Sequence, residues 1–173
     1  MKNNVRWDIA SVPDQGGKTA VVTGANSGLG YQITKVLADT GARVVMACRD
    51  TDKGKDALEK ILAGHTAQVP EVQFLDLADL SSVKSFAAEL NNQIEKLDLL
   101  INNAGLMPIP YNRTKDGFEM QFGVNHLGHF ALTGLLIDLI EKTPEARVVN
   151  VSSIGHRRGT MDFENLIYAG GEG

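Results

Sequence analysis

The chain has 173 residues, of which 43% are hydrophobic and 22% are charged. This size and balance are typical of a soluble globular domain, and they exclude collagen-like, disordered and disulfide-scaffold proteins. With 17 Lys and Arg residues against 21 Asp and Glu residues the net charge is −4, so no nucleic-acid partner is expected. The single cysteine, Cys48, cannot form an internal disulfide, which fits a reducing compartment.

Residues 1–17 are predicted to form a polar N-terminal arm, and residues 18–173 a single domain. The arm lacks the apolar segment of a signal peptide. The most apolar stretch, residues 127–140, is interrupted by glycines and polar residues and falls short of the roughly 20 apolar residues that span a bilayer. No transmembrane segment is therefore expected, and the sequence favours a cytoplasmic protein.

Five short runs rich in β-branched residues alternate with segments of helical periodicity. This alternation is typical of βαβ units, so we expect an α/β protein with a parallel sheet and helices on both of its faces. The five expected strands are residues 19–23, 43–48, 72–76, 99–102 and 147–152.

Four helices are expected between and after these strands, and three of them carry a single apolar stripe, as helices that cover a sheet do. The stripes are Leu29, Ile33, Val36 and Leu37 in the first, Ala57, Leu58, Ile61 and Leu62 in the second, and Val83, Phe86, Ala87, Leu90 and Ile94 in the third. The first helix should end at Gly41, and the third should begin after Asp79 or Ser81 as N-cap. The fourth, about residues 118–142, is apolar around most of its second half, so a further neighbour should cover it.

The segment Thr23-Gly24-Ala25-Asn26-Ser27-Gly28-Leu29-Gly30 lies between the first strand and the first helix. Gly24 would permit the tight turn, Gly28 would let the backbone approach a diphosphate, and Gly30 would allow the helix to pack closely on the strand. The helix N-terminus would add unpaired N–H groups and a partial positive charge. The turn therefore predicts a dinucleotide site, although many strand-to-helix turns use glycine for geometry alone. A P-loop is disfavoured because no lysine follows the turn before Lys35.

The residue that follows the second strand indicates which dinucleotide binds. NAD sites usually place an acidic side chain about 20 residues after the glycine turn. Here that region carries Arg49, whose guanidinium suits a phosphate group and favours NADP. Alternatively, Arg49 is a solvated residue paired with Asp50 or Asp52, and the nearby Asp50 keeps NAD as the alternative coenzyme.

Together these residues resemble the short-chain dehydrogenase/reductase family, from about Gly17 to the last residue. The spacing of the glycine turn is similar to the family's own, Asp76-Leu77 resembles its adenine-contacting pair, and Asn102-Asn103-Ala104-Gly105 resembles its motif beside the coenzyme. The resemblance implies a Rossmann-type doubly wound sheet of strand order 3-2-1-4-5. It also implies coenzyme contacts at Thr23, Gly24, Asn26, Ser27, Gly28, Leu29, Gly30, Arg49, Asp76, Leu77, Asn103, Ala104 and Gly105.

Finer segments resemble the branch of this family that contains retinol dehydrogenase-like and protochlorophyllide reductase-like enzymes. They are Ala47-Cys48-Arg49-Asp50 and residues 75–81, 124–130 and 147–153. That branch commonly uses NADP(H), in agreement with Arg49.

Asn125 and Ser153 match the catalytic asparagine and serine of the family. The implied reaction is hydride transfer between NADP(H) and a small alcohol or carbonyl substrate. Ser153 would hydrogen-bond the substrate oxygen, and Asn125 would hold a water that links a lysine to solvent. A tyrosine would transfer the proton, with its pKa lowered by that lysine four residues later on the same helix face.

The Tyr-x-x-x-Lys pair that the resemblance requires after Ser153 is not found. The tyrosines are Tyr31, Tyr111 and Tyr168. The first two have a lysine at the right spacing but precede Ser153, and Tyr168 is followed at that spacing by Glu172. Residues 161–166 resemble an insertion that precedes the pair, so we expect a chain truncated before it, without the last strands of the family and inactive alone.

Other interpretations are weaker. His126 and His129 lack further ligands, so no metal site is predicted, and Cys48 is expected to be a small core residue. A module that binds NADP(H) without catalysis is the alternative function. A methyltransferase ranks last because it would need an acidic residue in place of Arg49. A homo-oligomer is expected from the resemblance alone.

Overall fold

The structure is a computed structural model, and it describes residues 8–64, 66–107, 109–160 and 162–165. Its elements in chain order are η1 (Ile9–Ser11), β1 (Thr19–Thr23), α1 (Gly28–Asp39), β2 (Arg43–Cys48), α2 (Thr51–Leu62), β3 (Glu71–Phe74), α3 (Leu80–Gln93), β4 (Leu99–Asn102), α4 (Met120–Phe122), η2 (Gly123–Gly128), α5 (His129–Leu135), α6 (Ile137–Lys142), β5 (Arg147–Asn150), η3 (Ile154–Arg158) and η4 (Phe163–Asn165).

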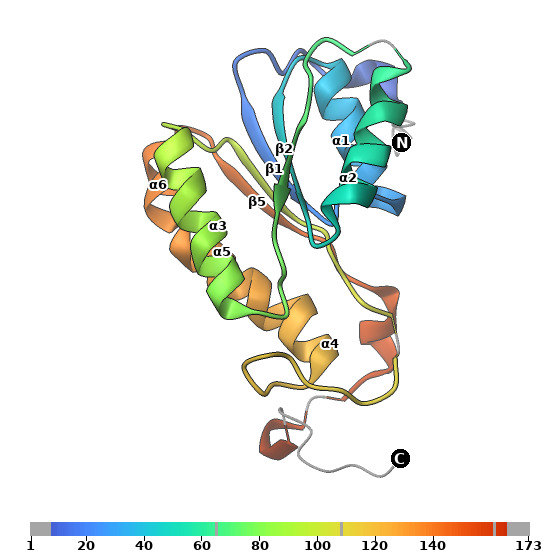
Figure 1. The fold of residues 1–173 in the computed structure, drawn as a ribbon, viewed down its shortest axis with the longest axis vertical. Coiled ribbons are helices and arrows are strands. Elements are labelled where there is room, and N and C mark those ends of the chain that lie inside the picture. The colour runs from blue at the N-terminus through green and yellow to red at the C-terminus, as the bar shows by residue number, and fades with distance from the viewer. Residues whose placement is uncertain (1–7, 65, 108, 161, 166–173) are drawn as a thin grey trace, which may run out of the picture.

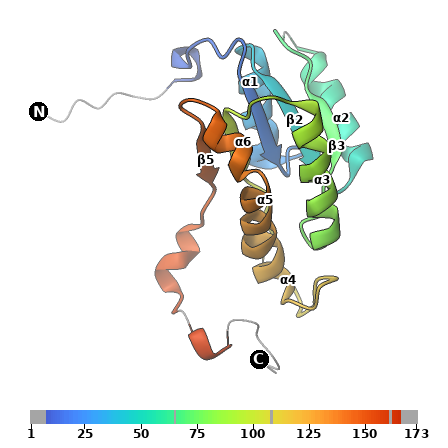
Figure 2. The same cartoon turned by 90° about the vertical axis from the view of Figure 1, so that its left-hand side faces the viewer.

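The strands form one parallel sheet in the order β3-β2-β1-β4-β5. Helices α1 and α2 cover one face, and α3, α5 and α6 cover the other (Figure 1). Figure 2 shows the chain leaving β5 and continuing through η3 and η4 outside the sheet. The predicted doubly wound α/β fold and its strand order are therefore confirmed.

Strand position explains which runs are fully apolar. Every residue of β1 is buried, and in β2 every residue after Arg43 is buried, because both strands are covered on both faces. β5 lies at an edge of the sheet, and Val149 and Val151 remain 43% and 42% exposed. Two predicted strands were too long: β3 ends at Phe74 and β5 at Asn150. Leu75 and Val151 each still donate one backbone hydrogen bond to the neighbouring strand, so hydrogen bonding between the strands continues one residue past these ends.

The predicted apolar stripe of α1 was wrong at its first residue. Leu29 is 65% exposed, since it lies in the first turn and faces the cleft described below. The buried stripe runs one residue later, over Gly30, Thr34, Leu37 and Ala38. The stripe of α3 and its Asp79 N-cap agree with the prediction.

The helix predicted over residues 118–142 begins at Met120 and is not one regular α-helix, so the prediction was wrong in its start and its regularity. α4 passes into η2, a π-helical turn, and α5 and α6 are separated at Leu136. Within this segment Thr133 donates its hydroxyl to the His129 carbonyl, which competes with helix bonding, and a Cβ at Gly128 would lie 2.6 Å from the Leu77 carbonyl oxygen. Phe130 in α5 is 71% exposed, and its ring centroid lies 6.3 Å from that of His126.

Two buried clusters hold the layers together, one on each face of the sheet. Before β1, the backbone N–H of Gln15 donates to the Thr40 carbonyl at 2.7 Å, which ties the incoming chain to the end of α1. Across the described residues, no helix combines the length and the apolarity that crossing a membrane would require.

Leu90 tests the packing of α3 on the sheet. Its side chain is fully buried in the cluster shared with α5. We expect Leu90→Ala to lower the free energy of unfolding by about 2–5 kcal/mol, because it leaves a cavity. Leu62→Ala is the matched control, since Leu62 is 42% exposed on α2, and it should change stability by less than about 1 kcal/mol. Urea denaturation measures both, and equal losses would contradict this packing.

Candidate coenzyme-binding site

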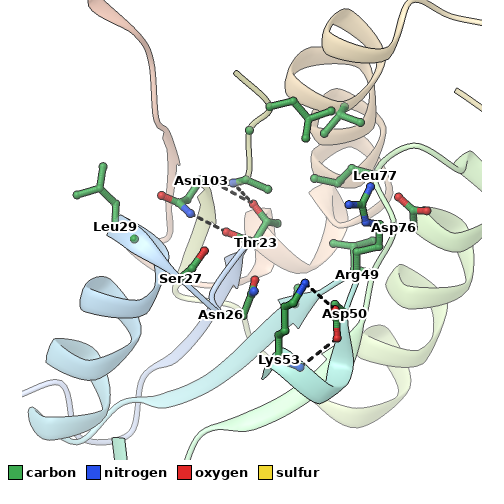
Figure 3. Close-up of a pocket in the computed structure, with 18 of the residues that line it drawn as sticks. Thr23, Asn26, Ser27, Leu29, Arg49, Asp50, Lys53, Asp76, Leu77 and Asn103 are labelled. Atoms are coloured by element: carbon green, nitrogen blue, oxygen red, sulfur yellow. Dashed lines mark hydrogen bonds and ion pairs between the residues drawn. The ribbon is translucent and has the colours of Figure 1, made fainter. Parts of the chain in front are cut away.

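A cleft of about 1020 Å³ opens at the carboxyl ends of the strands. In doubly wound sheets this is where ligands bind, beside the point at which the strand order reverses. All the predicted coenzyme residues except Gly30 line it. They are Thr23, Gly24, Asn26, Ser27, Gly28, Leu29, Arg49, Asp76, Leu77, Asn103, Ala104 and Gly105. The structure therefore brings together residues that are far apart in the sequence (Figure 3).

The three glycines of the turn have different roles. Gly24 has φ 64°, and a Cβ there would lie 2.9 Å from the Ala104 Cα. Gly28 has φ 54° with nothing within 4 Å of its missing Cβ, so its backbone is open to a ligand. Gly30 lies beneath the cleft, where a Cβ would overlap the Gly24 carbonyl and lie 2.6 Å from Asn103 Nδ2. Gly30 therefore serves packing.

Thr23 joins the ends of β1 and β4. Its hydroxyl oxygen accepts hydrogen bonds from the backbone N–H groups of Asn103 and Ala104, both at 2.9 Å. The Asn103 side chain donates in return to the Thr23 carbonyl at 2.9 Å. These bonds hold the Asn103–Ala104 backbone against the glycine turn, as Figure 3 shows.

The first turn of α1 has backbone donors to offer. Asp50 and Asp79 cap the first turns of α2 and α3 with their carboxylates, whereas Ser27, the N-cap of α1, makes no side-chain cap bond. The first N–H groups of a helix have no partner inside it. An anion in the cleft could therefore take these N–H groups and gain from the helix dipole.

The two aspartates that closely follow β2, Asp50 and Asp52, are paired with lysines of α2. Asp50 accepts from the backbone N–H of Lys53 at 3.0 Å and pairs with its Nζ at 3.1 Å, and these bonds lower the pKa of Asp50. Asp52 pairs with Lys55 at 3.3 Å. Among the described residues Arg49 has no hydrogen-bond or ion-pair partner, so the alternative in which it pairs with Asp50 or Asp52 was wrong. Sequence analysis missed Lys53, which also lines the cleft. Its position three residues after Asp50, a spacing at which helical side chains can pair, was the signal available in the sequence.

The far wall of the cleft is braced by the loop before α4. Lys115 donates to Asp79 at 2.7 Å and holds the pKa of that carboxyl well below its usual range. The backbone N–H of Lys115 donates to the Ala78 carbonyl at 3.0 Å. Asp76 itself accepts from the backbone N–H of Ala78 at 2.9 Å, so the segment that carries Asp76 and Leu77 is fixed at both ends.

The two predicted catalytic residues lie apart from this turn. Asn125, in η2, accepts from the Leu106 N–H at 2.7 Å and donates to the Leu106 carbonyl at 3.1 Å. It lines a second hollow of about 350 Å³ together with Ser152. Ser153 does not line that hollow; its hydroxyl accepts from the Gly155 N–H at 3.1 Å. Asn125 therefore shares a hollow with Ser152 but not with Ser153, and both serines follow β5.

The remaining candidates have structural partners. Lys35 is paired with Asp39 and Lys115 with Asp79, so the tyrosine–lysine spacings at Tyr31 and Tyr111 engage other groups. Tyr168 lies outside the described residues. In the described part of the chain no group of His, Cys, Asp and Glu could hold a metal.

Cys48 and His129 are both buried. Burial raises the pKa of the Cys48 thiol to about 11, so it is a neutral core residue as predicted. His129 is 5% exposed, and its Nε2 lies 2.8 Å from the Thr23 hydroxyl oxygen. Sequence analysis gave no signal for this contact, because the two residues are 106 positions apart.

Gly30→Ala tests the close approach beneath the cleft. Because its Cβ would overlap backbone atoms, we expect a loss of about 1–3 kcal/mol in the free energy of unfolding. Gly134→Ala is the matched control on α5, where nothing lies within 4 Å of the added Cβ, and it should gain up to about 1 kcal/mol from helix propensity. Thermal melts of both variants decide; no loss for Gly30→Ala would contradict the packing described.

Comparison with known proteins identifies the family of this chain. Residues 18–166 match the family model described as short chain dehydrogenase. Retinol dehydrogenase 11 from Mus musculus is 51% identical over 150 residues, which make up 87% of this chain and 48% of that protein. The chain thus spans about half the length of this curated relative.

Two solved structures extend the comparison. An uncharacterised protein from Mycobacterium paratuberculosis is 47% identical, with a TM-score of 0.80 over 94% of this chain and 56% of that one. RhlG from Pseudomonas aeruginosa, in a complex with NADP at its active site, is 26% identical, with a TM-score of 0.71 over 90% of this chain and 61% of that one. With its glycine turn, strand order and matches of this extent, the chain belongs to the short-chain dehydrogenase family.

Proposed function

We propose that residues 18–173 bind NADP(H) and supply the coenzyme-binding portion of an oxidoreductase that acts on a small alcohol or carbonyl compound. The observation that carries this proposal is the unpaired guanidinium of Arg49 in a cleft whose other side is the glycine turn. The NADP complex of RhlG supports the choice of coenzyme. NAD is the alternative coenzyme, and the commitment of Asp50 to Lys53 speaks against it.

Each part of the coenzyme has matching groups in the cleft. The backbone of Gly28 and the first turn of α1 would bind the diphosphate. Arg49 would bind the 2′-phosphate through two N–H groups, and Lys53 would add a second positive charge beside it. Asp76 and Leu77 would lie along the adenine, and Asn103, Ala104 and Gly105 along the nicotinamide side.

The bound nicotinamide would supply or accept the hydride. Ser153 would hydrogen-bond the substrate oxygen as charge develops there, and Asn125 would order a water near it. The hydroxyl of Ser153 accepts a hydrogen bond from the Gly155 N–H, which leaves its own proton available for the substrate oxygen. A proton donor in the form of a Tyr-x-x-x-Lys pair does not follow Ser153 within these 173 residues.

A second candidate function is an NADP(H)-binding module that does not catalyse, for which the residues of the cleft would suffice. The two candidates differ in whether the reading frame encodes Tyr-x-x-x-Lys downstream of Gly173, which sequencing of the transcript decides.

The name of the relative from Mus musculus favours an apolar alcohol or aldehyde as substrate. A cytoplasmic location and a homo-oligomer are further proposals, to be tested by cell fractionation and by sedimentation; the buried, free Cys48 agrees with the first.

The 2′-phosphate contacts predict a coenzyme preference. NADPH should bind at least about tenfold more tightly than NADH, because a hydrogen bond to a charged group contributes roughly 1.5–3 kcal/mol. Arg49→Asp should reverse the order, and Lys53→Gln should weaken NADPH binding and strengthen NADH binding, because it releases Asp50. Lys55→Gln, on the same helix but outside the cleft, should change neither. Fluorescence titration measures all four proteins, and equal affinities for the two coenzymes in every one would remove Arg49 from the site.

Catalysis by these residues alone is not expected. The 173-residue chain should bind NADPH yet leave its absorbance unchanged when retinal or a short aldehyde is added, because no tyrosine–lysine pair follows Ser153. A longer form that carries the pair should oxidise NADPH, and Ser153→Ala in that form should reduce kcat about a hundredfold or more. Turnover by the 173-residue chain would contradict the division of roles proposed here.

A further inference from the structure

A buried histidine connects the glycine turn to the helical segment that carries Asn125. His129 is 5% exposed and begins α5 directly after the π-helical turn η2. Its Nε2 lies 2.8 Å from the Thr23 hydroxyl oxygen, and its Nδ1 lies 3.1 Å from the Asn125 carbonyl oxygen. The imidazole therefore bridges β1 and η2 in the interior.

Counting protons at the Thr23 hydroxyl shows which way each bond points. The oxygen has two lone pairs and one proton. Both lone pairs are used, since it accepts from the N–H groups of Asn103 and Ala104. Its proton has two acceptors within reach: His129 Nε2 at 2.8 Å and the Ile101 carbonyl at 3.4 Å. The shorter distance assigns the proton to His129.

The protonation state of His129 follows from this assignment. Nε2 accepts a hydrogen bond and carries no proton, so the ring proton is on Nδ1 and is donated to the Asn125 carbonyl. A doubly protonated ring would aim an N–H at a hydroxyl whose lone pairs are already occupied. Burial lowers the pKa of His129, which agrees with a neutral ring.

We propose that His129, as the neutral Nδ1–H tautomer, is a positioning residue for the coenzyme site. By accepting the Thr23 proton it keeps both lone pairs of that oxygen on Asn103 and Ala104, which line the cleft opposite the glycine turn. It thereby sets the width of the cleft at the joint between β1 and β4. This role rests on the coenzyme binding proposed above, but the bonding pattern can be tested without any ligand.

The first experiment observes the free protein. Long-range proton–nitrogen NMR spectra of the uniformly labelled chain at neutral pH should show His129 as the Nδ1–H tautomer. In His129→Gln, whose amide oxygen can also accept the Thr23 proton, the amide signals of Asn103 and Ala104 should stay near their positions, while in His129→Leu they should shift. An Nε2–H tautomer, a charged ring, or unchanged amides in His129→Leu would overturn the proposal.

The second experiment measures the Kd for NADPH. We expect His129→Leu to raise it about tenfold and His129→Gln to raise it less than about threefold, because one buried hydrogen bond is lost in the first and kept in the second. His126→Gln, three residues earlier and exposed, is the matched control and should bind like the native chain. If both variants fold and lose the same amount of NADPH affinity, the proposal is overturned.

The two experiments separate the two proposals. If the native chain does not bind NADPH, the proposed coenzyme function fails, and the tautomer and the amide shifts still decide the role of His129. If NADPH binds and His129→Leu binds it as tightly as the native chain, only the positioning role fails. Should His129→Leu not fold, the tautomer of the native ring and the affinity of His129→Gln carry the decision.

Discussion

The site depends on how closely the backbone after β1 approaches the backbone after β4. Gly24 meets Ala104 at a distance that leaves no room for a Cβ, and Gly30 lies over the Gly24 carbonyl. The Thr23 hydroxyl then fastens the two segments with two backbone hydrogen bonds. Because this joint is tight, the first turn of α1 and the Asn103–Ala104 segment become opposite walls of one cleft. A wider joint would separate the helix N-terminus from the other residues that line the cleft.

Charge placement adds selectivity to this shape. Every carboxylate near the end of β2 is occupied: Asp50 by Lys53, and Asp52 by Lys55. An acidic side chain that is already neutralised by a lysine is a poor partner for ribose hydroxyl groups, whereas an unpaired guanidinium is a good partner for a phosphate. The local ion pairs of α2 therefore influence which dinucleotide the cleft can take, although these lysines and aspartates are exposed and contribute little to stability.

How far the sequence could predict this protein depended on the range of each interaction. Central strands such as β1 are continuous apolar runs, and α3 has a clear stripe and a capping aspartate, so both were predicted correctly. Leu29 was misplaced because periodicity does not reveal that the first turn of a helix extends past the sheet. The π-helical turn η2 was not predicted; Gly128 in it lies close to Leu77, and such an approach of residues far apart in the sequence is not visible in local periodicity. The glycine turn was found from its spacing, while the His129–Thr23 bond, which joins distant segments, was not.

The buried thiol of Cys48 has a practical consequence. It is the sole cysteine of the chain, lies within the core and is held in its neutral form by burial. Thiolate is the form that alkylating reagents attack, so the native chain offers such reagents almost nothing. A cysteine introduced at Leu29, on the exposed rim of the cleft, would be the one reactive sulfur. Spin labels or fluorophores attached there could then report on the cleft. Cys48 would not need to be replaced first, because it would not react with the label.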